Sequence, residues 1–205
     1  MNLQVTNLSK SFYQSPVFQS FSLKIESGEK IGLSGPNGSG KTTLLKMISG
    51  IMSIDSGKIR IGENDVNPDE PGPRKNVYYL GHSVGLYAGL TGHENLTFIS
   101  GLYGKTSHNI SSVLIKVRLD PVQDRLVKFF SQGMLQRLKL ASAIILDPDI
   151  LLLDEPLTGL DANGIKLFES VLVKWNESRK TIIIVSHDSD WLRTNTDRII
   201  ELKQC

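Results

Sequence analysis

The sequence has 205 residues, of which 40% are hydrophobic and 21% are charged, an ordinary balance for a chain that buries a sizeable core. Its formal net charge of +2 is too small to indicate binding to nucleic acid or to an anionic membrane surface. The longest apolar runs are four residues, as at 150–153 and 182–185, whereas a membrane-spanning helix needs about 20. The single cysteine, Cys205, cannot form an internal disulfide. These features favour a reduced, cytoplasmic protein without membrane spans.

Two short strands are expected near the N-terminus, at residues 2–8 and 20–25. In the second, apolar residues alternate with polar ones, as a sheet with one buried face requires. The polar segment between them is broken by Pro16 and contains Phe12 and Tyr13. Either ring could stack on a nucleobase, and a partly buried loop aromatic is the alternative.

A glycine-rich segment at 35–42 fits the pattern Gly-x-x-x-x-Gly-Lys-Ser/Thr, between an expected strand at 30–34 and an expected helix at 43–48. Glycines let the backbone wrap around an anion with its N–H groups pointing inward, and the helix adds the positive end of its dipole. Lys41 can then reach the β- and γ-phosphates of a nucleotide, and the Thr42 hydroxyl can ligate Mg²⁺. A purely structural turn is the alternative, but the flanking strand and helix argue against it. The expected phosphate-binding residues are Gly35, Pro36, Asn37, Gly38, Ser39, Gly40, Lys41, Thr42 and Thr43.

The middle of the chain changes character. Short strands are expected at 57–62 and 77–80, with a loop rich in proline and glycine between them. Residues 92–118 then have helical periodicity. The apolar face of this segment is formed by Leu96, Ile99, Leu102 and Tyr103. We therefore expect a helical subdomain at 84–135, inserted into a core built around a parallel sheet.

The alternation of strands and helices returns in the last third of the chain. A long helix is expected at about 131–146, with Ser131 well placed as its N-cap. The later elements are buried strands at 150–153 and 181–185, a helix at 162–178 and a short strand at 197–202. This succession predicts an α/β fold with a parallel sheet.

Two carboxylates, Asp154 and Glu155, directly follow the buried strand at 150–153. Ligands of α/β sheets gather at the carboxyl ends of the strands, so Asp154 is expected near the phosphates. There it can hold Mg²⁺ through water, together with Thr42. Glu155 is then a candidate general base that polarises the attacking water. The alternative, that both carboxylates merely end a strand at the surface, is disfavoured by the phosphate-binding segment.

Three segments together resemble motifs of the ATP-binding cassette (ABC) ATPases. Residues 154–161 (Asp-Glu-Pro-Leu-Thr-Gly-Leu-Asp) resemble the Walker B motif and D-loop, and residues 130–137 (Phe-Ser-Gln-Gly-Met-Leu-Gln-Arg) stand at the spacing of the signature motif. His187 ends an expected strand, as the switch histidine of that family does. Matching segments cover 2–202. The resemblance implies a P-loop NTPase fold in a single domain, 1–205, with a RecA-like parallel-sheet core, an antiparallel β portion and a helical insertion.

The resemblance also implies an ATPase that uses ATP and Mg²⁺ and acts as a dimer of identical or different ATPase subunits. Each ATP would lie between one phosphate loop and the other subunit's signature, where Ser131 and Gly133 would contact the γ-phosphate. Considered alone, Ser131 is also an ordinary helix cap, and a histidine that ends a buried strand is often structural. Asp161 would organise the dimer interface. The implied catalytic residues are Lys41, Glu155 and His187, and the implied signature residues are Ser131, Gln132, Gly133 and Met134.

The chain departs from the family pattern in three places. His82 stands where the family usually has the Q-loop glutamine. Because neutral imidazole offers one nitrogen acceptor, we expect it to sense the γ-phosphate or bind water rather than to ligate Mg²⁺ directly. The signature reads Phe-Ser-Gln-Gly-Met instead of Leu-Ser-Gly-Gly-Gln but keeps the serine and the second glycine, so its phosphate contacts should survive. The adenine-stacking aromatic is either Phe12 or Tyr13, with Phe12 slightly preferred.

Resemblance to a transporter ATPase without membrane spans implies a separate membrane-spanning subunit and a location at the cytoplasmic face of the cell membrane. Residues 81–96 lie where such ATPases bind that subunit. Within them, Leu86, Tyr87 and Leu90 could form an apolar socket, or could pack inside the helical subdomain. The pattern Leu-Tyr-x-x-Leu-Thr-x-x-Glu-Asn-Leu and the small size resemble the haem-exporter ATPase of cytochrome c maturation. The Ser-x-Gly-Met variant also occurs in multidrug and polysaccharide-type exporters.

Two further functional classes fit the sequence less well. Soluble cassettes of translation or DNA repair usually carry two cassettes or large insertions, and this sequence has neither. It also has no visible patch of basic residues for nucleic acid, so no nucleic acid partner is expected. A cassette that binds ATP without turnover is disfavoured, because Lys41, Glu155 and His187 are all present.

Overall fold

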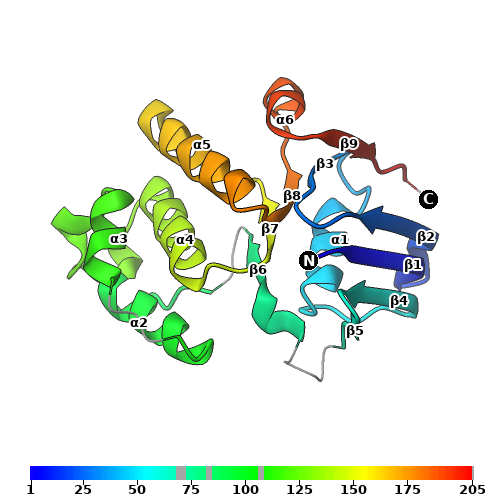
Figure 1. Ribbon diagram of the computed structural model, residues 1–205, viewed down its shortest axis with the longest axis horizontal. Coiled ribbons are helices and arrows are strands. Elements are labelled where there is room, and N and C mark those ends of the chain that lie inside the picture. Colours follow the sequence, from blue (N-terminus) through cyan, green and yellow to red (C-terminus); the bar gives the residue numbers. More distant parts are fainter. Residues whose placement is uncertain (68–72, 82–84, 106–108, 205) are drawn as a thin grey trace. The chain divides into compact units, whose positions relative to one another are not determined.

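The structure is a computed structural model and describes residues 1–67, 73–81, 85–105 and 109–204. His82 and Cys205 lie outside the described residues. The chain divides into two compact units (Figure 1). The first, which we call the sheet unit, comprises Met1–Tyr79, Pro148–Glu155 and Trp175–Cys205. The second, the helical unit, comprises Leu80–Asp147 and Pro156–Lys174.

The sheet unit contains an antiparallel sheet with strand order β2-β1-β4-β5 (Figure 1). Its strands are β1 (Leu3–Phe12), β2 (Ser15–Ile25), β4 (Ser56–Ile61) and β5 (Asn64–Asp65). Leu3, Val5 and Leu8 of β1 are buried while Gln4 and Thr6 are exposed. This is the one-sided burial that alternating sequences produce in a sheet with a single covered face.

The first two strands are longer than the predicted strands at 2–8 and 20–25. They form a hairpin in which Tyr13 and Gln14 make the turn, with φ of +47° and +68°. The predicted loop around Pro16 is therefore wrong, since Pro16 lies in β2 and pairs with β1. A proline is accepted there because β2 is an edge strand, at which a missing N–H costs little.

The second sheet of this unit has the order β6-β7-β8-β3-β9. Its strands are β3 (Lys30–Ser34), β6 (Val77–Leu80), β7 (Ile150–Asp154), β8 (Thr181–Val185) and β9 (Arg198–Glu201). The pairs β7–β8, β8–β3 and β3–β9 are parallel. β7 and β8 are buried at every residue, which explains why their apolar runs do not alternate. The predicted α/β fold with a parallel sheet and an antiparallel portion is confirmed.

The described part of the sheet unit also contains the helices α1 (Lys41–Ile48) and α6 (Ser189–Asn195) and the 3₁₀ turn η1 (Pro73–Asn76). Helix α6 was not among the predicted helices, and it is only seven residues long. Oδ1 of Asp188 caps it by accepting the Trp191 N–H at 2.9 Å. Leu192 of α6 packs against Gly32 of β3, where an added Cβ would lie 2.7 Å from the Leu192 Cγ. Tertiary packing thus stabilises a helix too short to be marked by its periodicity.

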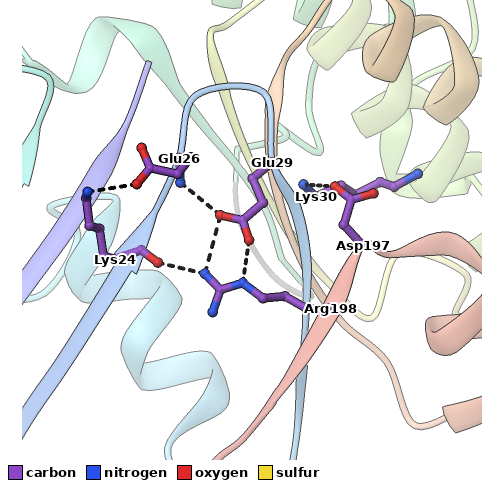
Figure 2. A network of polar contacts seen from close by, with 6 residues as sticks. All are labelled: Lys24, Glu26, Glu29, Lys30, Asp197 and Arg198. Atoms are coloured by element: carbon purple, nitrogen blue, oxygen red, sulfur yellow. Dashed lines mark hydrogen bonds and ion pairs between the residues drawn. The ribbon is translucent and has the colours of Figure 1, made fainter.

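A polar network ties β9 to the segment between β2 and β3 (Figure 2). The Arg198 guanidinium pairs with Glu29 through Nε and Oε1, and through Nη2 and Oε2 at 3.3 Å. It also donates to the Lys24 carbonyl at 2.7 Å. The neighbouring Asp197 accepts the backbone N–H of Lys30 at 2.8 Å. The hydrogen bond from Arg198 is the main reason that the pKa of Glu29 lies below its usual value.

In its described residues, the helical unit contains four helices and two 3₁₀ turns. They are α2 (Gly92–Leu102), α3 (Ile110–Lys116), η2 (Asp120–Val122), η3 (Val127–Phe129), α4 (Gln132–Leu146) and α5 (Ala162–Glu177), whose last residues from Trp175 on belong to the sheet unit. The unit includes more than the segment 84–135 that the sequence suggested as a helical insertion. None of the helices in the described parts of the chain is both long and apolar enough to cross a membrane.

Local sequence explains where these helices begin. Thr91 and Glu94 form a capping box at the start of α2. Oγ of Ser131 accepts the backbone N–H of Met134 at 3.3 Å, so the predicted N-cap of α4 is confirmed. The predicted apolar face of α2 is wrong at its C-terminal end, because Leu102 is 64% exposed.

Candidate active site

The loop between β3 and α1 needs glycine at two crowded positions. The backbone φ is +139° at Gly35 and +91° at Gly40. A Cβ on Gly35 would lie 2.3 Å from the carbonyl oxygen of Leu202, and one on Gly40 would lie 2.6 Å from Cγ1 of Val17. Any larger residue would therefore push the loop away from β2 or from the segment after β9.

Lys41 is the first residue of α1 and is largely buried, at 9% exposure. Its ammonium donates to the carbonyls of Gly35 at 2.7 Å and Pro36 at 2.9 Å. The positive charge is thereby held over the loop, at the end of α1 where the helix dipole is also positive. Both features attract an anion to this point.

A cavity of about 270 Å³ opens beside the loop. It is lined by Phe12, Val17, Asn37, Gly38, Gly40, Lys41, Thr42, Thr43, Asp154, Glu155, Val185 and His187. All of these except Val17 and Val185 were candidates from the sequence, and they come from four separate parts of the chain. The cavity lining does not include Gly35, Pro36 or Ser39 of the loop, nor Tyr13, which is fully exposed.

Asp154 ends β7 and is held by a neighbour that the sequence did not indicate. The Tyr79 hydroxyl, on the adjacent strand β6, donates to Oδ2 of Asp154 at 2.9 Å. Both residues are buried, at 8% and 7% exposure. Burial, and secondarily the charge of Asp154, raises the pKa of Tyr79 well above its usual value. Only the strand order reveals this pair, since nothing in the sequence distinguishes Tyr79 from Tyr78.

Glu155 has a left-handed backbone with φ of +52°, and its N–H donates to the Val185 carbonyl at 3.0 Å. Oε2 accepts the His187 N–H at 3.3 Å, and Nε2 of His187 lies 3.3 Å from Oε1. Oε1 is buried, and none of the described residues forms a hydrogen bond with it, because the imidazole is within ion-pair distance but poorly aligned. Burial outweighs the nearby imidazole and raises the pKa of Glu155. A carboxyl of this kind is suited to taking a proton from water.

The donor set of the cavity fits Mg²⁺. Thr42 and Asp154 present oxygen atoms to the same cavity, and Mg²⁺ prefers oxygen ligands. Within the described residues, no cluster of three or more histidine, cysteine or acidic side chains could hold a metal by itself. A metal here would thus take its other ligands from phosphate and water, as Mg²⁺ usually does.

The predicted signature and D-loop residues lie in the helical unit. Gln132, Gly133 and Met134 form the first turn of α4, and a Cβ on Gly133 would lie 2.7 Å from the Gly159 carbonyl oxygen. Two contacts join the start of α4 to residues 156–161. Gln136 donates to the Pro156 carbonyl at 2.8 Å, and Arg137 pairs with Asp161 at 2.7 Å. Oδ1 of Asp161 also accepts the Gly164 N–H at 2.8 Å. The start of α4 and residues 156–161 are therefore one packed structure.

Comparison with known proteins identifies the family. The profile of the ABC transporter family matches residues 18–158. The chain belongs to the ABC transporter family of ATP-binding proteins. The cassette is 36% identical over 185 residues to the ABC transporter ATP-binding protein NatA of Bacillus subtilis (strain 168), covering 87% of this chain and 75% of NatA.

Other similar proteins have names that refer to different processes. The linearmycin resistance ATP-binding protein LnrL of Bacillus subtilis (strain 168) is 31% identical over 96% of the cassette, and the sulfate/thiosulfate import ATP-binding protein CysA of Escherichia coli (strain K12) is 35% identical over 100% of it. The cassette spans only 65% of the length of LnrL and 58% of that of CysA.

Solved structures show the same fold. An ATP-binding subunit of an ABC transporter superposes with a TM-score of 0.90 at 27% identity, covering 98% of the cassette and 86% of the other chain. The ATP-binding cassette MJ0796, in a dimeric post-hydrolysis state with ADP and Pi, gives a TM-score of 0.89 at 26% identity, covering 98% and 94%.

Proposed function

We propose that this cassette hydrolyses ATP to drive a membrane transporter, and that the cavity beside the phosphate loop is the hydrolysis site. The observation that carries the proposal is the convergence of Lys41, Glu155 and His187 on one cavity next to a glycine-rich loop. MJ0796, which shares the fold, is described with ADP and Pi after hydrolysis, and this supports the same chemistry here.

Each side chain of the cavity has a role that its chemistry allows. Lys41 and the N–H groups of residues 37–43 bind the β- and γ-phosphates. Thr42 and Asp154 would hold Mg²⁺, which neutralises phosphate charge when bound. Glu155 accepts the proton of the attacking water, and its raised pKa makes it a stronger base than an exposed glutamate. His187 positions Glu155 and reaches the γ-phosphate.

Phe12 is the aromatic residue that we propose to stack on adenine. It lines the cavity and is 38% exposed, whereas Tyr13 in the adjacent hairpin turn is fully exposed and does not line it. The Lys10 ammonium lies 5.5 Å from the centroid of the Phe12 ring. Because Asp55 accepts from Lys10 at 2.6 Å and from the Ser11 N–H at 2.7 Å, the backbone before Phe12 is held in place.

We also propose that two cassettes pair, identical or different, so that the signature residues Ser131–Met134 of one act on the ATP of the other. A helix N-terminus with a serine at its cap binds phosphate well, and α4 begins with this arrangement. The contacts of Asp161 with Arg137 and with the Gly164 N–H hold that carboxylate beside the signature helix, where it can organise the interface. MJ0796 is described as dimeric.

The membrane-spanning partner is proposed to bind the start of the helical unit. Tyr87 and Phe98 stack edge to face at 4.8 Å and remain 50% and 41% exposed, and Leu102, on the same helix as Phe98, is 64% exposed. The buried amide of Asn95 holds this loop, accepting the Tyr87 N–H at 2.7 Å and donating to its carbonyl at 3.0 Å. Leu86 and Leu90, predicted with Tyr87 as an apolar socket, are half-buried. Aromatic residues held in this way on a surface favour a protein partner. With a membrane-spanning partner bound there, the cassette would lie at the cytoplasmic face of the membrane.

We propose that the transporter is a haem exporter of cytochrome c biogenesis. This finer proposal rests on the sequence pattern Leu-Tyr-x-x-Leu-Thr-x-x-Glu-Asn-Leu, which follows β6. LnrL, whose name refers to drug resistance, supports the alternative of a multidrug-type exporter. The similarity to CysA, whose name refers to sulfate and thiosulfate import, shows that overall identity does not assign the substrate.

The test of the motor function uses Glu155→Gln. This variant should bind ATP as tightly as the natural chain. It should lose turnover, which phosphate release measures, and it should form a dimer in the presence of ATP, which light scattering detects. Lys41→Ala should fail already at ATP binding. Normal turnover in Glu155→Gln would overturn the role of the base.

The transport role has its own experiment. The tagged cassette should copurify with a membrane-spanning protein from detergent-solubilised membranes, and Tyr87→Ser with Phe98→Ser should reduce that recovery without changing ATP turnover of the isolated cassette. Recovery with ribosomes or DNA and no membrane protein would contradict the transporter assignment.

A further inference from the structure

The contact between Tyr79 and Asp154 joins a residue outside the family motifs to a residue that the proposed function assigns to Mg²⁺. Tyr79 lies on β6 and Asp154 at the end of β7, adjacent strands of one sheet. The hydroxyl oxygen is 2.9 Å from Oδ2 in a buried setting. Asp154 lines the cavity, whereas Tyr79 does not. Tyr79 therefore contacts the carboxylate of Asp154 without itself lining the cavity.

The direction of this hydrogen bond is fixed by chemistry. An ionised carboxylate can only accept, so the phenol must donate. The hydroxyl therefore supplies its proton to Oδ2 across 2.9 Å in a buried setting. Tyr79 engages this one oxygen of the carboxylate and not Oδ1.

We propose that Tyr79 is a positioning residue for the metal site, whose hydroxyl fixes the orientation of Asp154 so that Oδ1 faces Mg²⁺ or its water shell. The proposal rests on the proposed role of Asp154 in holding Mg²⁺. Partners of this kind, bonded to a carboxylate that serves a metal, commonly change metal affinity by about 10–100-fold when removed. Loss of the hydroxyl would let the carboxylate rotate and leave Oδ2 buried without its donor.

A purely structural role makes a different prediction. If the hydroxyl only satisfies a buried carboxylate, Tyr79→Phe lowers stability but leaves the Mg²⁺ dependence of nucleotide binding unchanged. If it positions Asp154, the Mg²⁺ dependence shifts while binding without Mg²⁺ stays constant. The two roles are therefore separated by titrating the metal rather than by measuring stability.

The experiment measures binding of the fluorescent nucleotide N-methylanthraniloyl-ATP, in chelator and then across a Mg²⁺ titration, with binding of Mn²⁺ followed by electron paramagnetic resonance. For Tyr79→Phe we expect about a 10-fold rise in the Mg²⁺ midpoint, unchanged affinity in chelator and a matching loss of Mn²⁺ affinity. Tyr78→Phe, the same chemical change one residue earlier on β6, should leave the midpoint unchanged. An unchanged midpoint in Tyr79→Phe overturns the proposal.

Asp154→Asn separates this inference from the proposed function. If Asp154→Asn removes the Mg²⁺ dependence and Tyr79→Phe does not shift it, Tyr79 has no positioning role although Asp154 serves the metal. If neither variant shifts it, the assignment of Asp154 itself fails. Should Tyr79→Phe not fold, 4-aminophenylalanine at position 79 restores a donor and 4-methylphenylalanine fills the site without one. A wild-type Mg²⁺ midpoint with the first and a raised midpoint with the second support the proposal, whereas equal midpoints, or folding only with the donor, overturn it.

Discussion

His187 contacts Glu155 twice: Nε2 lies 3.3 Å from Oε1, and the backbone N–H donates to Oε2 at 3.3 Å. The two side chains differ in exposure, since the imidazole is 68% exposed and the carboxylate side chain only 26%. The backbone contact holds a carboxylate that lines the cavity, and the exposed ring, which lines it too, can turn toward a bound phosphate. The backbone N–H of His187 thus orients the base, and its ring is available to contact the ligand.

His187→Ala should lower ATP turnover by about 100-fold, because the ring would no longer contact the γ-phosphate while charge develops there during hydrolysis. The affinity for ATP should change little, because Lys41 and the loop N–H groups remain. Single-turnover hydrolysis and equilibrium nucleotide binding measure the two effects separately. His93→Ala, on α2, is the matched control and should keep full turnover. A parallel loss of affinity in His187→Ala would show that the ring serves binding instead.

Glu155→Gln should stabilise the isolated fold at neutral pH, measured without nucleotide and Mg²⁺. Burial raises the pKa of Glu155, so the folded protein holds this proton more tightly than the unfolded chain. The stability from the protonated carboxyl is complete below the unfolded pKa of about 4.3 and is lost as pH rises through the folded pKa. Glutamine does not ionise, so the variant loses no stability as pH rises. A gain of about 1 kcal/mol in the free energy of unfolding would raise Tm by about 2–4 °C. The difference should disappear toward about pH 4.5; equal Tm values at neutral pH would contradict the assigned burial cost.

Arg198→Met should destabilise the sheet unit by about 1 kcal/mol at neutral pH, the upper range for a pair of this exposure, because the Glu29 contact is bidentate. Arg198 lowers the pKa of Glu29, so this stabilisation is present above the unfolded pKa and is lost as pH falls through the folded one. Urea unfolding at neutral and acid pH measures the change. Lys24→Met, which removes an exposed pair with Glu26, is the control and should have no measurable effect. A difference independent of pH would indicate lost packing rather than a lost ion pair.

Gly133→Ala should cost about 1–3 kcal/mol, because the new Cβ would lie 2.7 Å from the carbonyl oxygen of Gly159. Gly101→Ala is the natural comparison, since Gly101 also lies in a helix but has nothing within 4 Å of its added Cβ. That substitution should be neutral or stabilising by up to about 1 kcal/mol. Urea unfolding of both variants decides whether space, rather than helix propensity, explains the glycine in the signature.

Several features were predictable because neighbouring residues in the chain determine them. The phosphate loop depends on glycines and a lysine within eight positions, and the cap of α4 depends on Ser131 and an N–H three residues later. The buried strands β7 and β8 were predictable from their unbroken apolar runs. The loop and the cap rest on backbone conformations and hydrogen bonds that form within a few residues, whereas the two strands were marked by the apolar character of consecutive residues.

The tertiary structure decided what depends on contacts between distant segments. The hairpin that removes Tyr13 from the cavity lining, and the helix α6 that packs on Gly32, follow from strand pairing and side-chain packing. The hydrogen bond from Tyr79 to Asp154 joins residues 75 positions apart, and only the order β6-β7 brings them together. The sequence by itself thus specified which chemical groups were present for binding phosphate and activating water. The parallel sheet decided which of them meet, because it aligns the carboxyl ends of strands that are remote in the chain.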